Sequence, residues 1–538
     1  MQIKFLGAAR TVTGSCFMMK FNGISFAVDC GMHQGNREID SRNWDLRPYD
    51  PENIDFIILT HAHIDHSGLL PKAVQQGFKG KIYTTPPTRD LLEIMLYDSA
   101  HIQEMEAQWK SKKKARHGQN PVDPLYAHED VDKTLPLIQV QDYEQEFYPV
   151  KGMRVILKNA GHILGSAFVE IWIEEDGQEY KLVFSGDLGR PDQLMMKDPS
   201  SVEKADFLFL ESTYGNRNHK DENESLNELA EAIKYSFERG EKVIIPAFAV
   251  ERTQEIIYSL YLLYKDGRLP PELPVFLDSP LAIKATEIFR KNQKYFDSQT
   301  KEILQNGENP LDLPNLEFSE TAQDSMRLNE LRGPAVIISA SGMANAGRIK
   351  HHLRHNIWRR GASIVFVGFQ AKGTPGRKIV DGTKEIKIMG ERLAVNARVF
   401  TINGFSAHAG QSQILDWVSC FENPGLKILL VHGEYEGQKV LAQEIENTFG
   451  FDVHIPEYLE ECELMPDKKY EPHLPKEQTM RKINWEYLMG ETKDKIFALE
   501  KMEDKLEKMP WTDQTEIRDE LLDLNSGLSR LIASVHKE

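Results

Sequence analysis

Four side chains that commonly bind metals crowd into six residues, His61-Ala62-His63-Ile64-Asp65-His66, directly after the apolar run of residues 56–59. A short apolar run of this kind predicts a buried strand. Three imidazoles and a carboxylate at the end of one strand can converge on one point, and they are ligand types that Zn²⁺ takes in proteins. Packing alone does not easily explain such a cluster, so the sequence predicts a metal site built on the end of a β-strand.

Further polar residues occupy the same kind of position, at the end of an apolar run and beside a turn. These candidates are Asp29, His162, Asp187, Glu211, His408 and His432. Each of them alone could cap a helix or close a turn. Their repeated placement favours one shared site, because α/β folds gather functional groups at the ends of buried strands.

The order of strand-like and helix-like segments predicts a domain inserted into another domain. Short β-rich runs fill the first 80 residues, and a helical stretch follows at about residues 88–115. From residue 207 to about 378, apolar runs alternate with helical patterns, which indicates a parallel α/β unit. Short strands then return. We therefore expect one domain at residues 1–206 and 379–475, interrupted by an insertion at 207–378.

The last segment, residues 476–538, is predicted to be a helical tail. Apolar residues recur at helical spacing from Ile496 to Met509 and from Ile517 to Val535, with Pro510 between the two stretches. The apolar face of this hairpin could pack on the body of the chain, or it could form a homodimer or partner surface. The sequence leaves both interpretations open.

Composition limits the partners and the compartment. The formal net charge of −17 argues against a protein that coats nucleic acid, but it allows a local basic or metal-bearing cleft. One basic run at residues 110–117 could be a solvated helix end or a nucleic-acid contact. We find no run of 18 apolar residues, no secretory signal and no CxxC pair among the four cysteines. A cytoplasmic protein without membrane association is expected.

The ordered set of motifs resembles a known family over roughly residues 1–465. Asp29, the HAHIDH cluster, His162 and Asp187 resemble the metallo-β-lactamase superfamily. The motifs Glu-Ser-Thr at 211–213, Phe-Ser-Ala-His at 405–408 and Val-His-Gly-Glu at 431–434 resemble its β-CASP branch. That branch contains nucleases related to the mRNA 3′-end cleavage endonuclease and to ribonuclease J. Residues 161–166, 211–215 and 339–348 are more similar to bacterial relatives of the 3′-end endonuclease.

This resemblance implies an α/β fold: a metallo-β-lactamase αββα sandwich with an inserted parallel α/β β-CASP domain, followed here by the C-terminal helical tail. It also implies two Zn²⁺ ions per chain. The first ion would be bound by His61, His63 and His162, and the second by Asp65, His66 and His432, with Asp187 bridging both. Mn²⁺ or Fe could occupy similar ligands.

Further roles follow from the same resemblance. Asp29 would orient a ligand histidine through a hydrogen bond. Glu211 would support His408, the candidate general acid. The residues of the inserted domain that resemble substrate-side loops are Ser341, Gly342, Arg348, Thr374 and Arg377. Small residues there would let backbone N–H groups approach a phosphate, whereas the two arginines could equally be solubilising surface residues.

The expected function is a zinc-dependent ribonuclease that hydrolyses phosphodiesters of single-stranded RNA by attack of a two-metal-activated hydroxide. Endonuclease activity is expected, and additional 5′→3′ exonuclease activity stays open. One alternative is a metallohydrolase of a small ester or thioester, which the inserted domain and His408 disfavour. The other is a non-catalytic RNA-processing scaffold, which the intact ligand set disfavours.

Overall fold

The computed structural model describes residues 1–116, 118, 120–175, 177–218, 222–368, 370, 373–402, 404–465, 472–473 and 485–535. The chain divides into two units, Met1–Leu474 and Pro475–Glu538. His117, the last residue of the basic run, and the expected start of the tail at residue 476 lie outside the described residues.

An eight-stranded mixed sheet carries the HAHIDH cluster. Its strands, in spatial order, are β23 (Pro472–His473), β22 (Glu461–Glu463), β1 (Gln2–Phe5), β2 (Phe17–Phe21), β3 (Ile24–Val28), β4 (Phe56–Ile58), β5 (Lys81–Thr84) and β6 (Ile138–Val140). Strands β3 to β6 run parallel, and Val28 pairs with Ile58. The segments that follow β3 and β4 therefore leave the sheet at the same edge.

A seven-stranded mixed sheet carries most of the other candidates. Its strands, in spatial order, are β21 (Asp452–His454), β20 (Lys427–Val431), β11 (Phe207–Glu211), β10 (Gln178–Phe184), β9 (Ala167–Glu175), β8 (Met153–Asn159) and β7 (Glu146–Phe147). Strands β10, β11 and β20 are parallel, and Glu211 pairs with Val431. Asp187, Glu211 and His432 consequently lie near one another at the carboxyl ends of adjacent strands.

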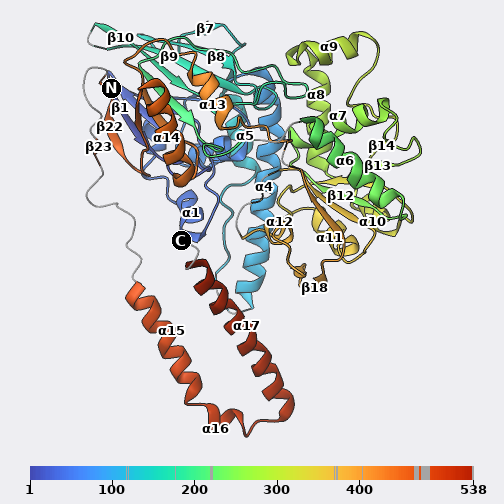
Figure 1. Ribbon diagram of the computed structural model, residues 1–538. Coiled ribbons are helices and arrows are strands. Elements are labelled where there is room, and N and C mark those ends of the chain that lie inside the picture. Colours follow the sequence, from blue (N-terminus) through green and yellow to red (C-terminus); the bar gives the residue numbers. More distant parts are fainter. Residues whose placement is uncertain are drawn as a thin grey trace. The chain divides into compact units, whose positions relative to one another are not determined.

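The two sheets pack face to face through an apolar, phenylalanine-rich core. Phe17 of the first sheet stacks on Phe184 and Phe209 of the second, with ring centroids 6.0 and 6.5 Å apart. Helices α3 (Leu70–Gln75) and α4 (Pro86–Ala115) cover the outer face of the first sheet. Helices α13 (Gln411–Val418) and α14 (Tyr435–Phe449) cover the outer face of the second (Figure 1). The expected αββα sandwich is confirmed.

The inserted domain is built on a six-stranded sheet in which every described pairing is parallel. Its strands, in spatial order, are β14 (Leu316–Phe318), β13 (Val275–Leu277), β15 (Val336–Ser339), β12 (Val243–Pro246), β16 (Ser363–Phe366) and β19 (Arg398–Thr401). Its helices are α6 (Glu222–Phe237), α7 (Arg252–Lys265), α8 (Pro280–Lys291), α9 (Ser298–Gln305), α10 (Ala322–Glu330), α11 (Ile349–Asn356) and α12 (Pro375–Val380). This parallel α/β insertion is confirmed.

The domain boundaries expected at residues 207 and 378 do not match the sheets that the neighbouring strands join. Strand β11 belongs to the sandwich, because it pairs with β10 and β20. Strand β19 belongs to the inserted domain, because it pairs with β16. Both differences have one cause: an apolar run looks the same in any buried parallel strand, so its residues do not specify which sheet it joins.

The remaining elements are short or peripheral. They include α1 (Arg37–Ser41), α2 (Ile64–Ser67), α5 (His128–Thr134), the hairpin of β17 (Glu385–Ile388) and β18 (Glu391–Ala394), and four short 3-10 helices. The helix expected at about 88–115 is α4, which begins at two prolines and is capped by the Thr85 side chain.

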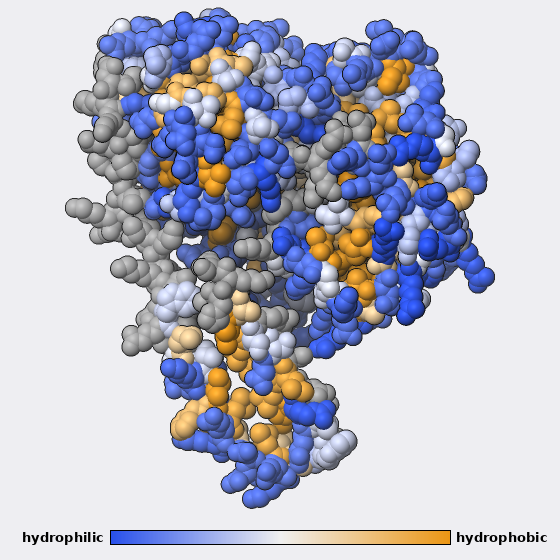
Figure 2. Space-filling model, in the orientation of Figure 1, coloured by the Kyte–Doolittle hydropathy of each residue, from blue (hydrophilic) through white to orange (hydrophobic). Residues whose placement is uncertain are grey.

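The described part of the second unit contains α15 (Trp485–Glu500), α16 (Glu503–Leu506) and α17 (Trp511–Val535), which confirms the helical tail. Several large apolar side chains of these helices are exposed, among them Phe497, Leu524 and Ile532. Apolar residues are visible between hydrophilic ones on these helices in Figure 2. Within the described part of the chain, no helix combines the length and apolarity needed to cross a membrane.

Candidate active site

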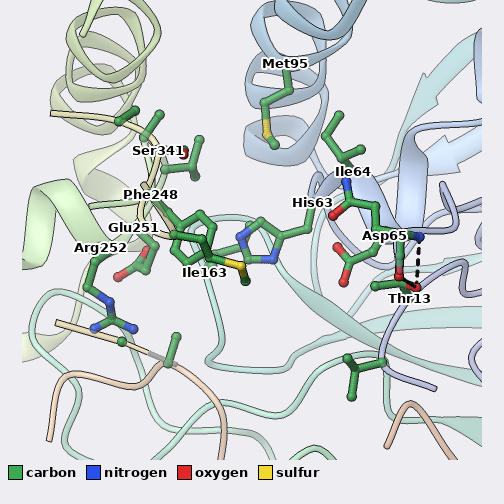
Figure 3. Close-up of a pocket in the computed structure, with 18 of the residues that line it drawn as sticks. Thr13, His63, Ile64, Asp65, Met95, Ile163, Phe248, Glu251, Arg252 and Ser341 are labelled. Atoms are coloured by element: carbon green, nitrogen blue, oxygen red, sulfur yellow. Dashed lines mark hydrogen bonds between the residues drawn. The ribbon is translucent and has the colours of Figure 1, made fainter. Parts of the chain in front are cut away.

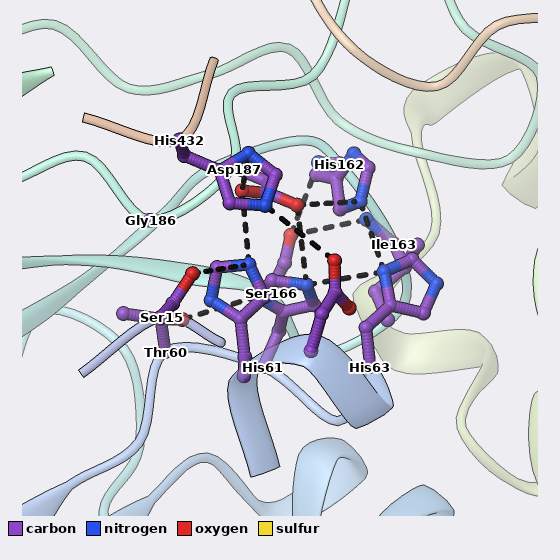
Figure 4. Close-up of polar contacts among 12 residues, drawn as sticks. Ser15, Thr60, His61, His63, His162, Ile163, Ser166, Gly186, Asp187 and His432 are labelled. Atoms are coloured by element: carbon purple, nitrogen blue, oxygen red, sulfur yellow. Dashed lines mark hydrogen bonds and ion pairs between the residues drawn. The ribbon is translucent and has the colours of Figure 1, made fainter. Parts of the chain in front are cut away.

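Four donor atoms from three loops form the first ligand group (Figure 4). His63 Nδ1 lies 3.1 Å from His61 Nε2 and 3.2 Å from His162 Nε2. Asp187 Oδ2 lies 3.5 Å from each of these two Nε2 atoms. Donor atoms that surround a tetrahedral Zn²⁺ at 2.0–2.1 Å are about 3.3 Å apart. The spacing of this group therefore fits a tetrahedral metal ion.

A second group lies against the other oxygen of Asp187. Helix α2 supplies Asp65 and His66, and the residue after β20 supplies His432. Asp187 Oδ1 lies 3.2 Å from His66 Nε2 and 3.4 Å from His432 Nδ1, and His432 Nε2 lies 3.5 Å from Asp65 Oδ2. Each carboxylate oxygen of Asp187 therefore faces a different ligand group.

Two buried atoms of this second group have unmet bonding capacity. Asp187 Oδ1 and His432 Nε2 are buried and form no hydrogen bond within the described part of the chain. A buried polar atom without a partner is costly and needs an explanation. A cation held between Asp65, His66, Asp187 and His432 would satisfy both atoms, so the residues present fit a second metal.

Hydrogen bonds from neighbouring residues orient the ligand side chains. Asp29 Oδ2 accepts from His66 Nδ1 at 2.7 Å and from Thr60 Oγ1 at 2.9 Å, and Asp29 Oδ1 accepts from the Thr60 backbone N–H at 2.8 Å. Thr213 Oγ1 lies 3.1 Å from His432 Nδ1. Such contacts fix ring orientation and tautomer. Sequence reasoning gave neither threonine a role, although Thr60 precedes the HAHIDH cluster and Thr213 belongs to the Glu-Ser-Thr motif.

The protonation of the first group suits metal binding. Burial lowers the pKa of His61 and His162 well below its usual range and that of His63 to about 4. Burial would raise the pKa of Asp187, but the nearby histidines, His432 first among them, outweigh it and hold that pKa well below its usual range. Neutral imidazoles around an ionised carboxylate are the forms that bind a cation.

His408 approaches the ligand groups from the loop that follows β19. Its ring centroid lies 4.4 Å from that of His162, and its Nδ1 lies 3.1 Å from Glu211 Oε1. Burial opposes a charge on this imidazole, but Glu211 and Asp187 outweigh burial and raise the pKa of His408 to about 9. The side chain is therefore an imidazolium at neutral pH and can act as a proton donor.

A cleft of about 990 Å³ lies over these groups, between the sandwich and the inserted domain. His63, Ile64 and Asp65 form one wall, and Phe248, Glu251, Arg252 and Ser341 form the opposite one, as Figure 3 shows. Met95 points into the cleft from α4 (Figure 3). A substrate in this cleft would contact the ligand groups and both domains at once.

Three of the five residues expected on substrate-side loops line this cleft: Ser341, Arg348 and Arg377. Gly342 packs beneath Phe248, because a Cβ built on it would lie 2.9 Å from that ring. Thr374 caps α12, where its hydroxyl accepts a hydrogen bond from the Arg377 backbone N–H at 3.2 Å. These two residues therefore shape the inserted domain.

Both arginines already have partners. Arg348 Nη1 donates to Asp278 Oδ1 at 2.7 Å and to the Ser319 carbonyl at 2.8 Å. Arg377 Nε donates to Asp381 Oδ1 at 2.9 Å. The partner of Arg348 lies 70 positions away and could not be anticipated from the local sequence, whereas Arg377 pairs with a residue only four positions further on.

Sequence reasoning also missed Glu251. This residue has a left-handed backbone, with φ 68°, and its buried carboxyl accepts a 2.9 Å hydrogen bond from Gln193 Nε2. Its Oε2 has no hydrogen-bond partner among the described residues. Burial, with a contribution from Glu255, raises its pKa to about 8. Residues 248–252 read only as a strand-to-helix junction, so no local signal marks Glu251.

Comparisons with known proteins agree with this architecture. The Metallo-beta-lactamase superfamily domain model matches residues 18–187, and the Beta-Casp domain model matches residues 253–379. The model described as a Zn-dependent metallo-hydrolase RNA specificity domain matches residues 392–456.

Curated relatives match over most of the chain. Ribonuclease TTHA0252 of Thermus thermophilus is 37% identical over 442 residues, which cover 82% of this chain and 95% of that protein. Transcription termination factor FttA of Methanosarcina mazei is 30% identical over 482 residues, covering 86% and 72%. The FttA of Thermococcus kodakarensis is 34% identical over 421 residues, covering 76% and 62%.

Proposed function

Because the chain belongs to the β-CASP family of the metallo-β-lactamase superfamily and is a metal-dependent RNA hydrolase, we propose that it cleaves phosphodiester bonds within single-stranded RNA with two Zn²⁺ ions. The observation that carries this proposal is the position of His408. Its imidazolium, paired with Glu211 at 3.1 Å, lies beside two ligand groups that share Asp187. A two-metal site stabilises the attacking and leaving oxygens of a phosphodiester, and a proton donor beside it can protonate the leaving group.

Two Zn²⁺ ions bound here would lower the pKa of a water molecule and neutralise a phosphate oxygen. His61, His63 and His162 would hold one ion, Asp65, His66 and His432 the other, and Asp187 both. Asp29 keeps the His66 ring in place through the 2.7 Å contact with Nδ1, which leaves Nε2 directed at Asp187.

His408 supplies the proton for the leaving group. Hydrolysis forms a bond between a water oxygen and phosphorus and breaks the bond between phosphorus and the 3′ oxygen. Since Glu211 engages Nδ1, the proton to be transferred is on Nε2 of His408. Its transfer to the departing oxygen leaves a 3′-hydroxyl and a 5′-phosphate, and such acid catalysis contributes about 10²–10⁴-fold to the rate.

The test is cleavage of internally and 5′-labelled single-stranded RNA by the zinc-loaded protein, beside the variants His408→Ala and Asp65→Ala. We expect internal cleavage by the wild type, a loss of about 10²-fold or more in kcat for His408→Ala, and no activity for Asp65→Ala. Progressive release of nucleotides from the 5′ end would add 5′→3′ exonuclease activity.

Two results would contradict the proposal. Hydrolysis of a small ester or thioester without cleavage of any RNA would indicate a small-molecule hydrolase. Inertness towards all substrates, with both ions bound, would indicate a scaffold.

The proposal also includes a cytoplasmic location, which is supported by the four free cysteines, since thiols persist in reducing compartments.

A further inference from the structure

We propose that the C-terminal half of α4 is a docking platform for the single-stranded RNA that continues out of the active-site cleft. This inference rests on the proposed ribonuclease function and identifies a binding surface outside the metal centre. It is carried by three features of residues 95–116: the direction of one helix face, the exposed apolar side chains on that face, and the cations that follow them.

One face of α4 is a continuous wall that begins in the cleft. Its cleft-lining residues are Met95, Asp98, Ile102, Met105 and Glu106. At about 100° per residue, these positions span an arc of roughly 100° on the helix surface. The next residues within the same arc are Trp109, Lys113 and Arg116, which extend the wall by about 16 Å beyond Met105 at 1.5 Å per residue.

The opposite side of the helix is anchored to the body of the protein. Ala107 is buried, and Ser111 Oγ accepts a 2.8 Å hydrogen bond from the Val122 backbone N–H. Both positions lie outside the arc that lines the cleft. The anchoring therefore fixes the rotation of the helix and turns Trp109 away from the body.

Large apolar side chains are exposed along this wall. Ile102, Met105 and Trp109 are 42%, 56% and 65% exposed, and they follow one another at helical spacing. Lys113 Nζ lies 5.8 Å from the centre of the Trp109 ring. An exposed indole beside a cation suits a nucleotide, because the base can stack on the ring while the phosphate faces the charge.

The charge on this segment opposes that of the whole chain. Residues 107–116 contain five cations and no acid, within a protein of formal net charge −17. Lys110 is paired with Glu106 at 3.0 Å, whereas Lys112, Lys114 and Arg116 form no ion pair within the described part of the chain. Phosphates of a bound strand would neutralise these cations and release counterions.

The same charges disfavour a second copy of the chain as the occupant. In a two-fold symmetric interface centred on this segment, the segment would face its own copy, and its unpaired cations would repel one another. An RNA strand bound in the cleft carries a charge opposite to that of these cations. Its continuation can reach the platform without the binding of a second molecule. RNA is therefore the partner that both the continuity of the wall and its charge favour.

The test compares a long and a very short RNA as substrates. We would measure kcat and KM for single-stranded RNA long enough to span cleft and platform, and for a dinucleotide confined to the cleft. For Trp109→Ala/Lys113→Glu we expect KM for the long RNA to rise about tenfold or more with kcat unchanged. KM for the dinucleotide stays unchanged. The single variant Trp109→Phe keeps a stacking ring and should therefore bind the long RNA with most of the wild-type affinity.

A salt titration supplies an independent measurement. Binding of the long RNA would be measured in the His408→Ala background, where the expected loss of about 10²-fold or more in kcat slows cleavage of the bound strand. The slope of log Kd against log salt concentration should fall by about one for each lost phosphate contact. Lys151→Glu, an equal charge change at an exposed turn, is the matched control and should leave KM for the long RNA unchanged.

The outcomes separate the two proposals. If the wild type cleaves RNA but the double variant leaves KM for the long RNA unchanged, the platform is refuted and the ribonuclease function stands. If the double variant changes only the oligomeric state of the protein, the face is an interface between copies and the platform is likewise refuted. If the wild type cleaves neither RNA, the proposed function itself fails.

Discussion

Glu211 is fully buried at the end of β11, and its Oε1 accepts hydrogen bonds from both the Leu188 backbone N–H and His408 Nδ1. Its charge therefore acts directly on the candidate proton donor. The strand-end position of Glu211 was predictable, because a carboxylate after four apolar residues has few structural uses. Its distance to His408, 197 positions away, was not predictable from local pattern.

Replacing Glu211 by Gln should shift the pH dependence of the reaction. The opposite charge that favours the imidazolium is removed, so the pKa of His408 falls and the alkaline limb of kcat moves to lower pH. A pH profile of kcat with saturating RNA measures this limb. The exposed Glu203→Gln is the control; identical profiles for all three proteins would exclude a role of Glu211 in setting this proton donor.

Glu251 should make stability depend on pH. Its pKa is about 8 in the folded protein against 4.5 for a free side chain, so the folded state binds more protons between these values. The stabilisation is complete below pH 4.5 and is lost as pH rises through about 8, with a slope of at most about 1.4 kcal/mol per pH unit. Urea unfolding across this window measures the slope.

Glu251→Gln keeps the shape of the side chain and removes its titration. The difference in unfolding free energy between variant and wild type should therefore widen in favour of the variant as pH rises. A constant difference across the window would mean that Glu251 titrates at its ordinary value.

At the scale of elements, the loop after β3 fixes α2 and thereby two ligands. The backbone N–H groups of Cys30 and Met32 donate to the carbonyls of His66 and Ile64, at 2.8 and 2.9 Å. Gly31 lies between them, and a Cβ built on it would stand 1.7 Å from the Asp65 carbonyl oxygen. The absence of a side chain at this position lets the loop and the ligand-bearing helix approach each other.

Gly31→Ala should therefore displace α2 while every ligand side chain keeps its chemical identity. We expect a loss of roughly 1–3 kcal/mol in stability and a metal affinity lower by about 10–100-fold. Thermal unfolding and zinc titration measure the two effects. Gly425→Ala is the matched control, since a Cβ there meets nothing within 4 Å; equal effects at both positions would contradict the close-approach argument.

At the scale of the whole molecule, the ligands join the two sheets. His61, His63, Asp65 and His66 follow β4 of the first sheet, whereas His162, Asp187 and His432 follow strands of the second. Ions held by both sets would cross-link the sandwich at one edge. Without them, Asp187 Oδ1 and His432 Nε2 stay buried with no hydrogen bond among the described residues.

Removing the metal should lower stability as well as abolish cleavage. A ligand that binds only the folded state raises the free energy of unfolding by mass action, so chelation should reduce the melting temperature by several degrees. Differential scanning calorimetry before chelation, after it and after zinc is restored measures this change. A melting temperature that is unaffected by complete metal removal would contradict the cross-linking role.

The sequence by itself determined the chemistry of the site and the class of fold. Ligand types at strand ends are local features, and the alternation of strands and helices reports a parallel sheet wherever it occurs. Only the tertiary structure decided which sheet β11 and β19 join, that Arg348 is already paired with Asp278, and that Glu251 faces the cleft. These features depend on contacts between segments far apart in the chain, which local residue patterns do not encode. The HAHIDH cluster needed no such information, because its side chains lie within six residues of one another and follow a single strand.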